Sequence, residues 1–179
     1  RAAFVYVGDA YHLMRHNESF MRQFLTELSE RIEDKSRAYT PEEAKQVPES
    51  YRNLAAQLCP SEMINVGHDY KKITPEGLQV FVPTSLNVMR VIDKYRDLIK
   101  AFWVTPNVPA SVAFFPQSVR RIALVSDTDS TIFTVQDWVI WYCGKISFSL
   151  KAYQIAATMI TLTSETITHV LAMMSANIG

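Results

Sequence analysis

The sequence predicts an α+β fold, in which a mainly helical first part is followed by an antiparallel hairpin and covering helices. Apolar residues recur at helical spacing through the first hundred residues, whereas two β-branched, apolar segments lie close together near residue 126. The charge also changes along the chain, since residues 1–102 carry 14 of the 18 basic and 14 of the 18 acidic residues. We therefore expect a mainly helical region of uncertain role over residues 1–110 and a second region over residues 111–179. The boundary falls in the proline-marked connection from Thr105 to Pro116.

Apolar periodicity defines the elements of the first part. Phe4–Val7 is predicted as a short strand, and a helix is predicted over Ser19–Asp34, where apolar residues follow at steps of four. Another helix, later in this part, is predicted to begin after Thr84 or Ser85. The apolar stripes of these two helices are Phe20, Phe24, Leu28 and Ile32 in the first, and Val88, Ile92, Tyr95, Ile99 and Phe102 in the other.

Helix-start and helix-stop signals place a further pair of helices. Thr40 is a candidate N-cap, because Pro41 follows it at the first helical position and Glu43 lies three residues after it. This is the pattern of a capping box. Pro48 should break this helix before a new one resumes over Tyr51–Leu58.

The second part begins with two strand candidates, Arg121–Ser126 and Thr131–Val135. The polar connection between them is too short for a parallel crossover, so the strands should pair antiparallel. Two helices are then expected over Leu150–Leu162 and Ser164–Ala176, the second capped by Ser164.

Composition excludes several classes of protein. The chain has 179 residues, 48% of them hydrophobic and 20% charged, which allows a packed core. The formal net charge is zero, so neither a basic nucleic-acid-binding arm nor an acidic tail describes the whole chain. Two distant cysteines favour a reducing, cytoplasmic compartment over a disulfide framework. No apolar run approaches the roughly 20 residues that cross a bilayer, and the initial Arg1 indicates a piece of a longer polypeptide.

The connection Asp127-Thr128-Asp129-Ser130 is the part of the sequence that argues for a reaction. Alternation along a strand places Asp127 and Asp129 on one face and Thr128 on the other. Two neighbouring carboxylates with few cations around them repel each other, and a divalent ion would relieve that repulsion. Hard oxygen ligands favour Mg²⁺, with Mn²⁺ also possible. We therefore expect Asp127 and Asp129 to be metal ligands in phosphoryl or nucleotidyl transfer.

This hairpin resembles motif C of family B DNA polymerases, which reads Tyr-Gly-Asp-Thr-Asp-Ser between apolar strands. Residues 127–130 match the motif, and Ile132 and Phe133 suit the returning strand, whereas Val125 and Ser126 replace the Tyr and Gly. The resemblance is specific over about fifteen residues and architectural over residues 111–179. It implies that this region is a polymerase-like palm whose antiparallel hairpin is catalytic.

The resemblance implies a DNA-directed DNA polymerase, a nucleotidyltransferase that extends a primer. Asp127 and Asp129 would be its catalytic residues and its Mg²⁺ ligands, with Asp129 bridging two ions. Primer–template DNA, deoxynucleoside triphosphates and the remaining polymerase domains of the parent chain would be its partners, with no membrane involved. It would work in the cytoplasm or at the nucleoid, or in the host cytoplasm if viral. Motifs A and B of the family, which supply a third carboxylate and hold the triphosphate, are not found in the sequence, so the isolated fragment should be inactive.

Two alternatives remain open from the sequence. Asp127 to Thr131 also resemble motif I of haloacid-dehalogenase-like phosphatases, in which Asp127 would be the nucleophile and Asp129 the general acid/base. In that fold, Arg121–Ser126 would be a parallel strand. The other alternative is a non-enzymatic interaction module with an ordinary Asp- and Ser-rich turn. Trp138, Trp141 and Tyr142 could stack on bases, but such a cluster more often covers a hydrophobic core, and we favour that role.

Overall fold

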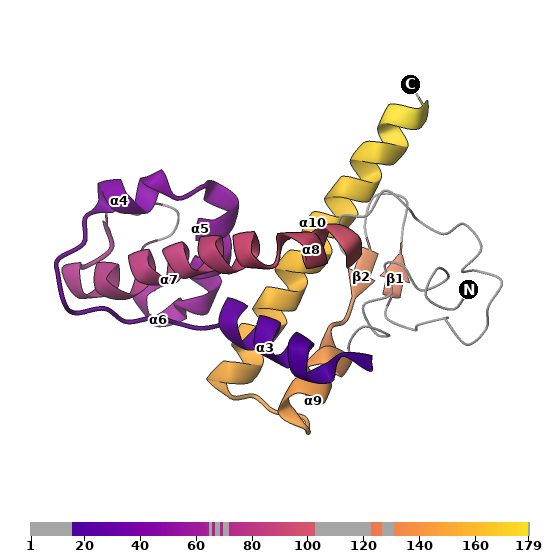
Figure 1. Cartoon of the computed structure of the whole chain (residues 1–179), viewed down its shortest axis with the longest axis horizontal. Helices are drawn as coiled ribbons and strands as arrows, with labels where there is room; N and C mark the ends of the chain where they lie inside the picture. Colours follow the sequence, from indigo (N-terminus) through magenta and orange to yellow (C-terminus); the bar gives the residue numbers. More distant parts are fainter. Residues whose placement is uncertain are drawn as a thin grey trace.

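A computed structural model describes residues 16–64, 66, 69, 72–102, 123–126 and 131–178. The predicted strand Phe4–Val7 and the predicted connection Thr105–Pro116 lie outside these residues. The described part is mostly helical, with two short strands (Figure 1). The elements are α3 (Glu18–Leu28), α4 (Pro41–Gln46), α5 (Glu49–Leu58), α6 (Pro60–Met63), α7 (Pro75–Lys94), α8 (Arg96–Phe102), β1 (Ala123–Ser126), β2 (Thr131–Phe133), α9 (Gln136–Cys143) and α10 (Leu150–Ile178).

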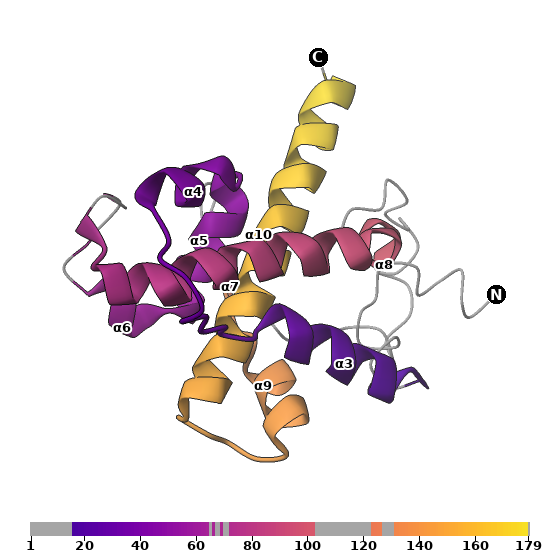
Figure 2. The ribbon, with the colours of Figure 1, turned by 60° about the vertical axis from the view of Figure 1, so that its left-hand side comes forward.

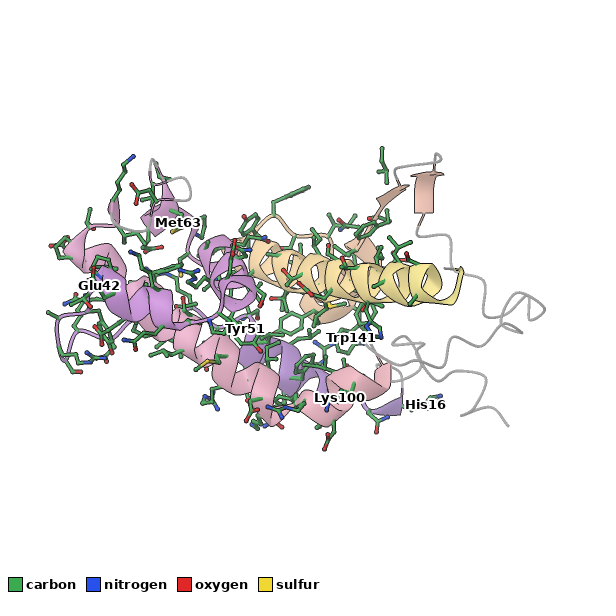
Figure 3. All side chains as sticks on the ribbon, turned by 90° about the horizontal axis from the view of Figure 1, so that it is seen from above. His16, Glu42, Tyr51, Met63, Lys100 and Trp141 are labelled. Carbon is green, nitrogen blue, oxygen red and sulfur yellow. The ribbon has the colours of Figure 1, made fainter. Side chains whose placement is uncertain are left out.

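Helix α7 is the centre of the helical part, since it packs against α3, α4, α5, α6 and α8. Helix α10 packs against α5, α9 and α3, and in both ribbon views its last turns extend away from the other helices (Figures 1 and 2). One hydrophobic core holds residues of both predicted regions, from Met21 and Phe24 of α3 to Ile155 and Met159 of α10. Tyr51 of α5 and Trp141 of α9, labelled in Figure 3, are partly buried and packed against this core. The division near residue 110 remains a proposal about how the chain is organised.

Helix α3 ends at Leu28, so the prediction of a helix continuing to Asp34 was wrong. The buried Ser29 ends it, with its hydroxyl donating to the carbonyl of Leu25 at 2.6 Å. The following segment then bonds to α7 instead of to itself, because the hydroxyl of Thr84 accepts from the Ile32 N–H at 3.0 Å and donates to the Ile32 carbonyl at 3.2 Å. The apolar stripe also differs from the predicted one, since Phe20 is 43% exposed. The buried side chains of α3 are Met21, Phe24, Leu25 and Leu28.

The capping box at α4 is confirmed. The Thr40 hydroxyl accepts from the Glu43 N–H at 3.3 Å, and a Glu43 carboxylate oxygen accepts from the Thr40 N–H at 2.8 Å. Pro41 occupies the first turn, where its missing N–H costs nothing. The break at Pro48 is confirmed as well, because α4 ends before it and α5 begins directly after it.

Helix α7 begins at Pro75, about ten residues before the predicted start, and it contains Pro83. A proline inside a helix removes one N–H and leaves the carbonyl four residues earlier without its usual donor. Here that carbonyl belongs to Gln79, and it accepts from the Asp34 N–H at 2.9 Å. The segment after α3 therefore satisfies the group that Pro83 would have orphaned. The predicted stripe is divided between α7 and α8 by a turn at Tyr95, and Val88 and Tyr95 are buried.

The C-terminal residues form one helix, α10, where two helices with a break near Ser164 were predicted. Threonine side chains in this stretch bond back to their own helix and leave the main-chain pattern intact. Thr158 donates to the Gln154 carbonyl at 2.9 Å and Thr166 to the Leu162 carbonyl at 2.8 Å. None of the helices that the structure describes is both long and apolar enough to cross a membrane.

Candidate active site

Strands β1 and β2 bring together the residues on either side of the Asp127–Ser130 connection. They pair antiparallel, with Ser126 opposite Thr131 and Val125 opposite Ile132, so the pairing direction is the predicted one (Figure 1). Strand β2 is shorter by two residues than predicted, residues 121 and 122 of the other predicted strand lie outside the described residues, and the ladder is irregular between Ala123 and Val125. Asp127 and Asp129 themselves lie outside the described residues. The sheet formed by the described residues has only these two strands, so the α+β palm remains a proposal.

Helix α9 follows β2 closely and has clear ends, although the sequence analysis did not predict it. The Thr134 hydroxyl accepts from the Gln136 N–H at 3.1 Å at its start. At its end, Gly144 has a φ of 74°, a conformation that favours glycine, and its N–H donates to the Ile140 carbonyl at 2.7 Å. The element that follows β2 in the chain is therefore a short helix with a sharply defined end.

Arg22 of α3 fastens α9 to the first helix of the described chain. Its Nη1 and Nη2 atoms each donate at 2.8 Å, to the carbonyls of Tyr142 and Trp141, which are orphan acceptors at a helix C-terminus. The Arg22 Cζ atom also lies 4.4 Å from the centroid of the Trp141 ring, within the range of a cation–π interaction. Thr26, one turn along α3, shares a 2.6 Å hydrogen bond between its hydroxyl and the Tyr142 hydroxyl.

The aromatic residues of α9 cover the core, as the sequence analysis favoured. Trp138, Trp141 and Tyr142 are partly buried and packed against it. Arg22 was missed, because no local pattern marks a residue whose partners lie about 120 positions away in the sequence. These contacts connect the hairpin, through α9, to the helical part of the chain.

Comparison with known proteins decides the family. The family model of divergent family B DNA polymerases matches residues 1–179, the whole chain. The chain belongs to this family. Neither a curated protein nor a solved structure matches it significantly. The antiparallel pairing of β1 and β2 also departs from the parallel strand that the phosphatase resemblance implies.

In this divergent family B polymerase, the predicted metal ligands fit a hard divalent ion by their chemistry. Asp127 and Asp129 offer carboxylate oxygens, which are the donors that Mg²⁺ and Mn²⁺ prefer. The residues that the structure describes contain no group of three or more His, Cys, Asp or Glu arranged to hold a metal. The described part of the polymerase therefore does not identify the third carboxylate.

Lys151, in the first turn of α10, forms a further polar contact at the end of α3, separate from those that Arg22 and Thr26 make with α9. Its ammonium lies 2.9 Å from the hydroxyl of the buried Ser29 and 5.9 Å from the centroid of the Tyr142 ring. Burial lowers the pKa of Lys151, and the negative charge of Glu30 opposes that shift. Helix α9 and the start of α10 are thus both bonded to α3 or to the residue that follows it.

Proposed function

We propose that this chain supplies the metal-binding hairpin of a template-directed DNA polymerase. The observation that carries the proposal is the antiparallel pairing of Ser126 with Thr131 around the sequence Asp127-Thr128-Asp129-Ser130, in a chain that belongs to the divergent family B DNA polymerases. Ser126 directly precedes the motif and Thr131 directly follows it, and the two residues are paired. This register supports a tight loop that would hold the carboxylates of Asp127 and Asp129.

In this proposal, Asp127 and Asp129 hold Mg²⁺, or Mn²⁺ in its place. When bound, such ions lower the pKa of an attacking hydroxyl and neutralise charge on phosphate oxygens. The role of the two aspartates is to hold that charge at a fixed place at the end of the hairpin. Primer–template DNA and deoxynucleoside triphosphates are the proposed substrates, and other domains of the polymerase provide the missing carboxylate and the triphosphate site.

The hairpin is connected along the chain to a helix that is itself well anchored, which matters because phosphoryl transfer depends strongly on positioning. Strand β2 leads through two residues into α9. The last carbonyls of α9 accept hydrogen bonds from Arg22, and its aromatic residues pack on the core. A displacement of the hairpin would therefore disturb contacts that reach as far as α3.

The test is primer extension by the intact protein carrying Asp129→Asn. Loss of one negative charge should abolish Mg²⁺-dependent extension while leaving DNA binding in place. Asp137→Asn is the matched control, because Asp137 is a nearby acid on α9, beyond the hairpin, and its loss should leave extension unchanged. Extension by Asp129→Asn within about tenfold of wild type, a barrier change of roughly 1.4 kcal/mol, would show that Asp129 is not a catalytic ligand.

A second assay offers the intact protein a phosphomonoester without primer or template. We expect no hydrolysis. Hydrolysis without primer extension, lost on Asp127→Asn, would replace the polymerase proposal with the phosphatase one. Failure of both activities in a folded protein would favour the interaction module.

A further inference from the structure

The loop between α9 and α10, residues 144–149, exposes apolar side chains to solvent. Phe148 is 99% exposed and Ile146 is 65% exposed, and Leu150, the first residue of α10, is 55% exposed. Single exposed apolar residues are common on protein surfaces, but a fully exposed phenylalanine beside two others suggests a contact surface.

Hydrogen bonds hold this α9–α10 loop at both ends. Gly144 closes α9, and the Ser149 hydroxyl accepts from the Ala152 N–H at 3.2 Å in the first turn of α10. Between them, the Ser147 hydroxyl lies 3.0 Å from the Ser149 hydroxyl and accepts from the Ser149 N–H at 3.3 Å. Phe148 is therefore presented outward by a loop whose neighbouring residues are fixed.

The charge around Phe148 favours an anionic partner. The sequence contains no Asp or Glu between Asp137 and Glu165, and the exposed charge of the loop is Lys145, because Lys151 is partly buried with its ammonium on Ser29. Lys145 is exposed and lies three residues from Phe148. The first turn of α10 carries no acid, so nothing there offsets the positive end of its helix dipole. An apolar protein surface would explain Phe148 alone, but not the exposed Lys145 beside it.

We propose that Lys145 and Phe148 form a contact site for single-stranded DNA, with a base stacked on the Phe148 ring and a phosphate beside the Lys145 ammonium. This inference rests on the proposed function for its choice of nucleic acid. Single-stranded DNA is the form that fits, because its bases have free faces, whereas those of a duplex are already stacked. Phenylalanine offers no hydrogen bond to a base edge, so the contact should be independent of sequence.

The test measures the affinity of the intact protein for a labelled oligothymidylate by fluorescence anisotropy over a range of salt concentrations. Phe148→Ala should raise the Kd roughly 5- to 150-fold, the cost of losing one stacked base. Phe148→Trp should keep the wild-type affinity, since it retains an aromatic face. Phe148→Leu should be as weak as Phe148→Ala, because it retains apolar size without a ring.

Lys145→Gln tests the phosphate contact separately. It should reduce the slope of log K against log salt by about 0.7, the value for one phosphate contact on a single strand, whereas Phe148→Ala should leave that slope unchanged. Ile64→Ala is the matched control, because Ile64 is 67% exposed but lies directly after α6, and it should change neither the affinity nor the slope.

Two outcomes would overturn the inference. Unchanged affinity in Phe148→Ala would show that the loop does not contact the strand. Wild-type affinity in Phe148→Leu would show that apolar area rather than an aromatic face holds the strand, and would overturn the stacked-base contact. Neither outcome affects the polymerase proposal, which depends on loss of extension without loss of binding in Asp129→Asn.

Discussion

The Arg22 guanidinium donates to two main-chain carbonyls of α9 and to a Glu18 carboxylate oxygen, at 2.8 Å in each case. A planar fork of donors can satisfy two adjacent helix-end carbonyls at once, which an ammonium cannot do in the same geometry. The side chain is 37% exposed, so solvent screening reduces the value of its ion pair more than that of its two hydrogen bonds to α9.

Replacing Arg22 should therefore destabilise the protein measurably. We expect Arg22→Ala to lower the free energy of unfolding by about 1–2 kcal/mol, and Arg22→Lys to recover less than half of that loss. Chemical denaturation followed by circular dichroism is the measurement. Arg96→Ala is the control, because Arg96 is exposed and its ion pair with Asp93 joins two exposed side chains only three residues apart in the sequence. Equal effects of Arg22→Ala and Arg96→Ala would mean that the α9 contacts contribute nothing to stability.

At the scale of elements, α7 and the segment after α3 depend on each other. Thr84 is fully buried, and its hydroxyl is bonded to both main-chain groups of Ile32, while the Gln79 carbonyl left without a helical donor by Pro83 accepts from Asp34. A proline in the middle of a helix is thus accommodated by a strand-like segment from elsewhere in the chain. This pairing explains both the early end of α3 and the length of α7.

Thr84→Val tests that pairing, because it keeps the shape of the side chain but removes the hydroxyl. It should lower the free energy of unfolding by about 1–3 kcal/mol, since a buried main-chain donor loses its partner. Thr84→Ser should retain most of the stability. Thr161→Val is the matched control, because the Thr161 hydroxyl donates only within α10, to the Ala157 carbonyl at 3.0 Å. A thermal or denaturant midpoint for Thr84→Val equal to that of Thr161→Val would contradict this account.

At the scale of the whole molecule, one core joins helices that precede the hairpin in the sequence to helices that follow it, from α3 to α10. The candidate ligands Asp127 and Asp129 come from one connection, and the described residues contain no group that completes a metal site. The activity we propose therefore requires at least one further carboxylate beyond those that the described residues bring together.

The 179-residue chain by itself should show no primer extension with Mg²⁺ and a primed template. Two aspartates leave the metal site short of a carboxylate, and motif B, which would orient the triphosphate, is not found in the sequence. The measurement is extension by the chain beside the intact protein under identical conditions. Extension by the chain alone would show that the missing carboxylate lies within these residues.

The signals that the sequence carried reliably are local ones. The capping box at Thr40, the break at Pro48 and the pairing of two strands across a four-residue connection each depend on residues only a few positions apart. The Asp-Thr-Asp-Ser motif is local as well, since its four residues are consecutive. The family resemblance depends on this motif, and the family model matches the whole chain. Short-range steric and hydrogen-bonding preferences determine such features without help from the rest of the molecule.

The features that only the tertiary structure decided involve partners about 45 to 120 residues apart. After α3 ends, the Ile32 N–H donates to the Thr84 hydroxyl. Helix α7 continues through Pro83 because the Asp34 N–H donates to the Gln79 carbonyl. The Arg22 guanidinium donates to a carbonyl at the end of α9. In each case a buried main-chain group needs a hydrogen bond, and the group that provides it is near only after folding. The spacing of residues in the sequence indicates which secondary structure a segment favours in isolation. In the folded chain, the free-energy cost of leaving a buried main-chain group without a hydrogen bond decides where each helix begins and ends.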